Sequence, residues 1–509
     1  MPAEYEAVIG LEVHAQLRTE TKLFCGCLTR FGASPNTQVC EICVGLPGAL
    51  PVVNEHALHL AVRAGYALGC EVQRKSQFAR KNYFYPDLAK GYQISQFDHP
   101  LNVGGFLDVA LEGPEDKTGG SDVKPDGSAK PHRMQTRRIR INRIHVEEDA
   151  AKNIHGAEGR GVTLVDFNRA GVPLIEIVSE PELRSAEEAE AYLRNLREVL
   201  VFAGISDGNL EEGSFRCDAN VSVRPAGTTK LGTRVELKNI NSFRFVRQAI
   251  QFEVARQIAQ RTAGAEVVQE TRTWNERDAT TRSMRGKEEA HDYRYFPDPD
   301  LPWVAFSTEE LDRQHALVPE LPQAKRARFV GEFGLTPYDA KVLTAHPGLA
   351  HYFDSCMTEL RQRLGEVQSK KLGKSLANLM QSELAPKVEY AGSGAEVPLG
   401  PAEVAEILIM VEEATISKTM AKKLTLRAIE TGLSPKALAE REGFIQVRDE
   451  GAIVDLVRQI LADNPQQVAQ VREGKTKVIG FFVGQTMKAM GGKADPALVQ
   501  KILRKELSS

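Results

Sequence analysis

The fold of this chain is decided by Val8-Ile9-Gly10-Leu11-Glu12-Val13-His14-Ala15-Gln16-Leu17. Its odd positions are apolar, whereas the even positions from the middle onward carry Glu12, His14 and Gln16. Because side chains alternate between the two faces of a strand, these three polar groups share one face. The stretch therefore predicts a β-strand that turns one face to a core and presents a carboxylate and an imidazole on the other.

The same alternation returns in two later segments. Residues 215–223 place Arg216 and Asp218 on one face, and residues 234–238 place Lys238 on another polar face. Long alternating strands of this kind are typical of antiparallel sheets. Arg216 and Lys238 are candidates for neutralising phosphoryl oxygens. The alternative is a structural network of salt bridges.

Acidic residues in two further segments complete a candidate metal site. Glu176 stands alone in the apolar run 173–178, and burying a carboxylate is costly unless it is paired or bound to a metal. Glu148 lies in the polar segment 143–149. Ligands that are mostly oxygen favour Mg²⁺, which is usually shared with substrate phosphates. The predicted magnesium ligands are Glu12, His14, Glu148 and Glu176.

Four of the seven cysteines lie close together in the sequence, at Cys25, Cys27, Cys40 and Cys43. In a reducing compartment this spacing favours a zinc knuckle over disulfides, because four thiolates complete a tetrahedral shell. Such a closed shell is structural, since it leaves no open position for catalysis. The alternative is a vestigial knuckle that binds its metal weakly.

Composition points to a soluble, multidomain protein. A chain of 509 residues exceeds what one hydrophobic core usually supports. We expect no membrane span and no signal peptide, and hence a cytoplasmic protein. The formal net charge of −3 argues against indiscriminate nucleic-acid binding, although residues 471–509 are locally basic.

Changes in composition divide the chain into three predicted domains. Residues 1–294 alternate strand and helix patterns, with helices expected at 185–204 and 242–264 and a polar loop at 113–132. A proline-rich segment then begins an all-helical domain over 295–405. Short amphipathic helices fill 406–509. The predicted fold class is α+β with a mainly antiparallel sheet, followed by two helical domains.

Several ordered motifs together resemble the B subunits of the tRNA-dependent aspartyl/glutamyl amidotransferases. The resemblance extends over nearly the whole chain, to Gly484-Gln485-Thr486-Met487-Lys488-Ala489 in the tail. The other matching pieces are Gly10-Leu11-Glu12-Val13-His14, the four cysteines, Lys81-Asn82-Tyr83-Phe84-Tyr85-Pro86-Asp87, His145-Val146-Glu147-Glu148-Asp149, residues 173–181, Arg216-Cys217-Asp218-Ala219-Asn220 and residues 291–298.

The resemblance implies a fold and an activity. The fold is a catalytic cradle of the glutamine-synthetase/guanido-kinase type, followed by a helical domain and a tail that binds tRNA. The activity is ATP-dependent transamidation of Glu-tRNA(Gln), Asp-tRNA(Asn) or both, with ammonia from a glutaminase (amidase) partner and a small third subunit in a heterotrimer. No phosphate-binding glycine loop is present, so ATP would be held by the sheet and its metal.

The resemblance also assigns roles to residues. It places Glu12, His14, Glu148 and Glu176 on Mg²⁺, with Lys81 and Asp218 as catalytic residues in or near the same pocket. Arg216 and Lys238 remain candidate contacts to phosphate or substrate. Two rival functions stay open from the sequence: a ligase of the glutamine-synthetase type acting on a free amino acid, and a non-catalytic RNA-binding protein.

Overall fold

The computed structural model describes residues 4–111, 135–157, 162–284, 293–391, 394–445, 450–472, 478–490, 494 and 496–508. The chain divides into two compact units, Met1–Pro322 and Gln323–Ser509. The loop predicted at 113–132 lies outside the described residues.

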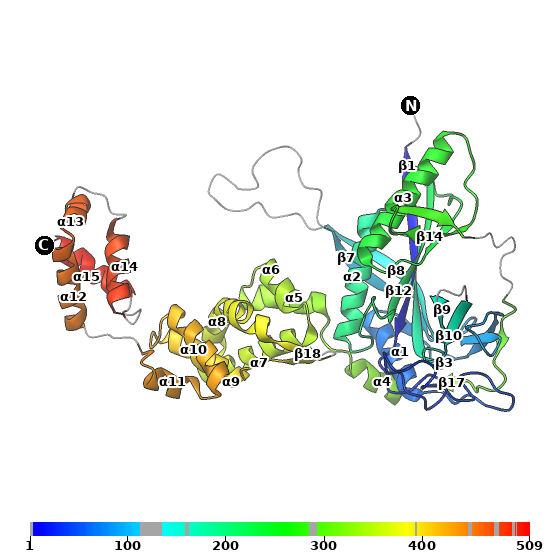
Figure 1. Cartoon of the computed structure of the whole chain (residues 1–509), viewed down its shortest axis with the longest axis horizontal. Helices are drawn as coiled ribbons and strands as arrows, with labels where there is room; N and C mark the ends of the chain where they lie inside the picture. Colours follow the sequence, from blue (N-terminus) through cyan, green and yellow to red (C-terminus); the bar gives the residue numbers. More distant parts are fainter. Residues whose placement is uncertain are drawn as a thin grey trace. The chain divides into compact units, whose positions relative to one another are not determined.

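A ten-stranded sheet forms the frame of the first unit (Figure 1). Its strands run in the order β15-β14-β13-β12-β1-β11-β8-β6-β2, and β7 pairs with β8. Their bounds are β1 Tyr5–Gln16, β2 Glu71–Val72, β6 Asn102–Val103, β7 Phe106–Leu111, β8 Gln135–Glu148, β11 Pro173–Ser179, β12 Phe215–Pro225, β13 Val235–Lys238, β14 Thr271–Asn275 and β15 Thr280–Ser283.

The pairings between these strands follow the predicted alternation. Within the described residues every pair is antiparallel except β13 with β14. On β1, Leu11, Val13 and Ala15 are at most 1% exposed, whereas Glu12 and His14 between them are only half-buried. One face of the sheet therefore belongs to the core and the other is polar.

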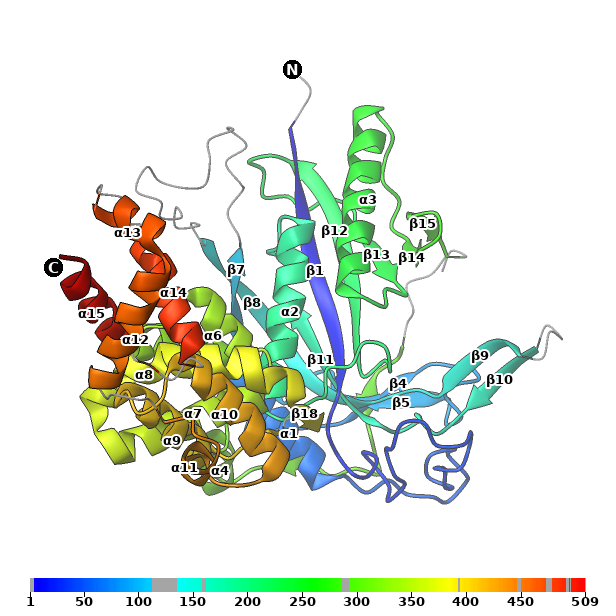
Figure 2. The same cartoon turned by 60° about the vertical axis from the view of Figure 1, so that its left-hand side comes forward.

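Helices cover the apolar face. Figure 2 shows α2 (Ala186–Phe202) and α3 (Phe243–Thr262) running along the sheet, and both contribute to its core together with α1 (Glu55–Ala67). Ser185 and Ser242 begin α2 and α3 as N-caps, and their hydroxyls accept from backbone N–H groups three residues on. Both helices thus lie within the predicted ranges.

Short strands complete the first unit beside the main sheet. Their pairings are β4 with β5 and β16, β3 with β17, and β9 with β10. Their bounds are β3 Lys75–Ser76, β4 Ala79–Asn82, β5 Tyr92–Ser95, β9 Lys152–Ala157, β10 Val162–Asp166, β16 Phe296–Pro297 and β17 Val304–Ala305. A fourth helix, α4 (Thr308–Ala316), packs against α1.

In its described residues, the second unit is helical apart from one pair of short strands, β18 (Glu389–Ala391) and β19 (Gly394–Glu396). One core runs from Phe329 to Ala439 and a separate one from Ile453 to Leu503. The helices are α5 Pro322–Phe333, α6 Pro337–Leu343, α7 Pro347–Leu364, α8 Glu366–Leu379, the π-helix Met380–Leu384, the 3₁₀-helix Ala385–Lys387, α9 Pro401–Glu412, α10 Lys418–Thr431, α11 Pro435–Arg441, α12 Glu450–Asp463, α13 Pro465–Arg472, α14 Ile479–Ala489 and α15 Pro496–Ser508.

The predicted α+β class, with helices after a largely antiparallel sheet, is confirmed at this level. The division into three domains stays a prediction. In the described part of the chain, no helix combines the length and the apolar character that a bilayer span requires.

Tyr192 of α2 offers a test of this core. The residue is 0% exposed, and its hydroxyl has no hydrogen-bond partner among the described residues. Since an unpaired buried hydroxyl costs free energy, Tyr192→Phe should stabilise the protein by about 1 kcal/mol and raise its melting temperature. Tyr192→Ala, which leaves a cavity, should instead cost about 3–5 kcal/mol. A marked drop in melting temperature for Tyr192→Phe would contradict this packing.

Candidate functional site

The polar face of the sheet gathers charged side chains because of the position of β1 between β11 and β12. His14 pairs with Glu176 on one side and with Arg216 on the other. Glu176 pairs in turn with His145 of β8. Directly paired residues project to the same face of an antiparallel sheet. The register therefore brings two imidazoles, a carboxylate and a guanidinium onto one surface.

Two carboxylates and two imidazoles form a tight cluster there. His14 Nε2 lies 3.6 Å from a carboxylate oxygen of Glu147 and 3.5 Å from one of Glu176. His145 Nε2 lies 3.5 Å from Glu147 and 3.2 Å from Glu176. The side chains of Glu147 and Glu176 are only 4% and 12% exposed. The acids are thus held close together and away from bulk water.

The imidazoles keep these acids ionised. Burial alone would raise the pKa of Glu176, but the neighbouring His145 and His14 hold that pKa well below its usual value. Burial opposes a charge on His145, yet the field of Glu176 and the hydrogen bond to Glu147 raise its pKa to about 9. Burial and the like charges of Glu176 and Asp218 raise the pKa of Glu12. An added cation would relieve this crowding of negative charge.

The geometry fits a single divalent ion. Ligand atoms of His14, Glu147 and Glu176 all lie within 4.8 Å of one another. Two ligands of one Mg²⁺ ion, at about 2.1 Å each, can be at most about 4.2 Å apart. Both distances from His14 to the acids are below that limit. Two oxygen donors and one imidazole could therefore share an ion here.

The cluster opens into a cavity of about 340 Å³. The cavity is lined by acids, bases, aromatic rings and few apolar groups. Its walls are His14, Lys81, Tyr83, Asp87, Leu88, Gln93, Glu147, Asp149, Ala150, Leu174, Arg216, Asp218, Lys238 and Tyr293. Three cations (Lys81, Arg216 and Lys238) thus face the same space as the acids.

Each of these cations is held in place. Arg216 donates to Asp149 over 3.0 Å, and Lys238 Nζ lies 3.1 Å from Asp218. Burial opposes the charge of both cations, yet these two acids raise the pKa of Arg216 and of Lys238. Lys81 Nζ sits 4.8 Å from the centre of the Tyr293 ring. Fixed cations of this kind need no reorganisation when an anion arrives.

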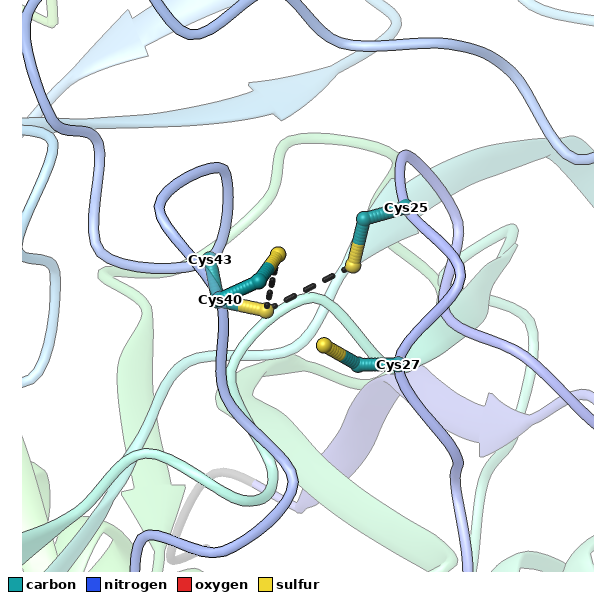
Figure 3. Close-up of side chains that lie close together, drawn as sticks. All are labelled: Cys25, Cys27, Cys40 and Cys43. Atoms are coloured by element: carbon teal, nitrogen blue, oxygen red, sulfur yellow. Dashed lines mark hydrogen bonds between the residues drawn. The ribbon is translucent and has the colours of Figure 1, made fainter.

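A second cluster, of four cysteines, lies in the loop after β1 (Figure 3). Cys43 Sγ is 3.5 Å from the sulfur of Cys25 and 3.7 Å from that of Cys40, and all four sulfurs lie within 4.8 Å of one another. Sulfurs around one zinc ion are about 3.8 Å apart. The Cys25 thiol and Lys22 lower the pKa of Cys43 to about 4, and burial raises the pKa of Cys27 to about 11. The donor set therefore fits a tetrahedral metal.

Comparison with known proteins identifies the family. A model described as the GatB/GatE catalytic domain matches residues 7–312, and a model described as the GatB domain matches residues 365–507. The chain belongs to the GatB family. Among its relatives are proteins named as the B subunit of aspartyl/glutamyl-tRNA(Asn/Gln) amidotransferase. The one from Geobacter sulfurreducens is 49% identical over 509 residues, and the one from Thermodesulfovibrio yellowstonii is 46% identical over 508; each match covers 99% of both chains.

Most of the residues predicted for the GatB site meet in the structure. Glu12, His14 and Glu176 share the polar face, and Lys81, Arg216, Asp218 and Lys238 line the adjoining cavity. Cys25, Cys27, Cys40 and Cys43 converge as predicted from their spacing. Their roles as ligands and catalytic groups stay predictions.

Glu148 is placed apart from this set. Its carboxylate pairs with Lys90 and accepts from the backbone N–H of Ile94 at 2.9 Å. Neighbouring residues of a strand point to opposite faces, so Glu147 rather than Glu148 faces His14. The predicted role of Glu148 as a metal ligand stays a prediction that these contacts do not favour.

Sequence reasoning missed Glu147 and the supporting His145. The signal was available, because Arg143, His145 and Glu147 alternate with Ile144 and Val146. That alternation assigns His145 and Glu147 to one polar face. The alternation therefore placed Glu147, not Glu148, on the face of His14.

This arrangement predicts different roles for the two adjacent acids of this GatB-family chain. Glu147→Gln should weaken Mn²⁺ binding, measured by electron paramagnetic resonance, by at least about tenfold, because it removes a charged ligand. Glu148→Gln should weaken it far less, since its carboxylate is held by Lys90 and Ile94. Melting temperatures of both variants control for unfolding. Equal losses for two folded variants would contradict the assignment.

Proposed function

We propose that this chain is the kinase and transamidase component of a tRNA-dependent amidotransferase. It would use ATP to phosphorylate the side-chain carboxylate of Glu-tRNA(Gln), Asp-tRNA(Asn) or both, and ammonia would then displace the phosphate to give the amide. The observation that carries this proposal is the His14–Glu147–Glu176 cluster, which opens into a cavity lined by three fixed cations. The names of the relatives supply the substrate class.

The chemistry explains why such a site needs charges of both signs. Hydroxide is a poor leaving group from a carboxylate, whereas phosphate is a good one. Transfer of a phosphoryl group spreads negative charge over its oxygens. Lys81, Arg216 and Lys238 would bind and orient those oxygens in the cavity. Magnesium held by His14, Glu147 and Glu176, with Glu12 beside it, would supply further neutralisation of the ATP phosphates.

The amide-forming step assigns a role to Asp218. Ammonia reaches the site as a neutral nucleophile and gains a positive charge when it attacks, so a carboxylate nearby favours the attack. Asp218 lies in the cavity wall, 3.1 Å from Lys238. We assign Asp218 and Lys81 to the part of the cavity where ammonia meets the activated carboxylate.

The finer fold, the partner chains and the second metal belong to the same proposal. A polar-faced antiparallel sheet supports a cradle of the glutamine-synthetase/guanido-kinase type. The relatives are named as parts of a larger enzyme, which supports a complex with a glutaminase and a small third protein in the cytoplasm. The sulfur spacing supports a structural zinc ion on the four cysteines.

The basic tail would bind the body of the tRNA. Its described part exposes Lys488, Lys501 and Arg504 on α14 and α15, and it has its own small core around Ile453 and Phe482. Cations on a rigid helical surface suit contacts to phosphates rather than to base edges.

The decisive experiment measures ATP hydrolysis with ammonium present. Hydrolysis that requires misacylated Glu-tRNA or Asp-tRNA, and that yields the amidated tRNA, would support the proposal. The controls are uncharged tRNA and free glutamate, and the assay is repeated with the glutaminase partner present. Hydrolysis with free glutamate alone would instead identify a small-molecule ligase.

Asp218→Asn tests the amide-forming step separately. It removes a negative charge but keeps the size of the side chain. We expect ammonia-dependent turnover to fall by about a hundredfold or more, within the range for general acid–base groups. ATP binding should weaken much less than turnover, because Lys81 and Arg216 keep their places in the cavity. Unchanged turnover would exclude a catalytic role for Asp218.

Charge reversal in the tail tests the tRNA contact. The double change Lys501→Glu and Arg504→Glu should lower affinity for tRNA and reduce its salt dependence, since each lost phosphate contact lowers the slope by roughly 0.7–0.9. Filter binding at several salt concentrations measures both. The matched control is the double change Lys341→Glu and Lys371→Glu, at exposed positions of α6 and α8 outside the tail. Identical affinity and slope would refute the role of the tail.

A further inference from the structure

Lys22 is a charged side chain in the protein interior, where lysine is rarely found. It follows β1 in the loop that carries the four cysteines, and it is 0% exposed. Taking an ammonium ion out of water costs several kcal/mol unless a nearby negative charge and good hydrogen bonds compensate. The surroundings of this lysine must therefore supply an anion.

The three protons of the ammonium have three acceptors. Lys22 Nζ lies 2.8 Å from the carbonyl oxygen of Gln38, 3.2 Å from that of Phe167 and 3.3 Å from Cys43 Sγ. The two carbonyls satisfy hydrogen bonds but carry no net charge. The ion pairs found among the described residues do not include Lys22. Cys43 is thus the acceptor of the three that can balance the charge, since a cysteine that binds a metal does so as a thiolate.

A metal centre on these cysteines needs a cation in return. Four thiolates around one Zn²⁺ ion leave two uncompensated negative charges. We propose that Lys22 is a built-in counter-charge of the four-cysteine metal centre, and that the buried ammonium and the metal-bound thiolates stabilise one another. This inference rests on the metal site proposed above.

The same lysine joins the cysteine loop to the wall of the catalytic cavity. Gln38 belongs to the cysteine loop, whereas Phe167 belongs to the turn after β10. From that turn Arg169 donates to the carbonyls of Ala150 and Ala151, both at 2.9 Å. Ala150 lines the cavity next to Asp149, the acid that holds Arg216.

Through these contacts, the metal would also affect residues outside the cysteine loop. Without the metal, the four cysteines are no longer joined through one ion, so Cys43 and Gln38 can move away from Lys22 and its contact with Phe167 can open. The turn that supports Ala150 and Asp149 would then lose one of its anchors. Loss of the metal should therefore expose the Lys22 side chain to solvent.

The unmodified full-length protein can test this directly. Zinc content is measured first, and lysines are then acetylated with and without prior treatment with a strong zinc chelator, with each site followed by mass spectrometry. We expect Lys22 to be protected in the zinc form and to react at least about tenfold faster after zinc removal. Lys230, which is exposed, should react equally in both forms.

A variant supplies the reciprocal test. Lys22→Met keeps the aliphatic length and removes the charge, and it should release zinc to a chromogenic chelator about 10–100-fold faster, the usual scale for a residue that contacts a metal ligand. Lys230→Met is the matched control and should release zinc at the wild-type rate.

The outcomes separate the two proposals. Wild-type protein without zinc would overturn the metal site and this inference with it. Bound zinc, with Lys22 still protected after complete zinc removal, would overturn the inference alone. Equal release rates for a folded Lys22→Met would do the same, and if that variant fails to fold, the protection experiment decides.

Discussion

Glu147 and Glu176 repel each other, and the attraction of His14 and His145, which outweighs that repulsion, is the interaction on which the polar face of the first unit depends. Both acids approach the same two imidazoles, and both are largely removed from water. Such a cluster persists only if rigid strands fix the position of each member. The register of β11 between β1 and β8 supplies that rigidity, because an apolar side chain alternates with each polar one and anchors it to the core. The core beneath the sheet is thus the support of the charges above it.

Sequence periodicity predicted the polar face of the sheet well for strands whose two faces differ strongly in polarity. Glu12, His14 and Glu176 alternate with apolar neighbours, so their direction could be inferred without a structure. The faces of two adjacent acids at the end of a strand are harder to predict, since a shift of one residue exchanges the two faces. The sequence prediction named Glu148, whereas the structure turns Glu147 toward His14 and Glu148 toward Lys90. The alternation of Arg143, His145 and Glu147 assigns Glu147 to the polar face, but only the pairing of β8 with β11 shows that this face meets His14.

Other features depended on contacts distant in sequence. The spacing of the cysteines predicted their convergence, but a lysine in a polar loop is ordinarily solvated, so nothing local marked Lys22 as buried. The first unit extends past the predicted boundary at 294 because Phe306 and Leu311 join its core. Likewise Leu438 and Ala439 belong to the same core as Phe329, across the boundary predicted at 405. Proline-rich composition located breaks in the pattern, whereas core membership is a property of packing.

The placement of β1 also has a consequence for biosynthesis. The strand is made first, yet both its neighbours in the sheet come much later, β11 at Pro173–Ser179 and β12 at Phe215–Pro225. At roughly 5–20 residues per second, β1 waits on the order of ten seconds or more on the ribosome before its second edge can pair. His14 has no Glu176 to contact until β11 is made, and Glu12 has no Asn220 until β12 is made. A nascent chain of this protein therefore carries an unpaired strand edge for most of the time in which its catalytic unit is synthesised, and that edge is what chaperones would have to shield.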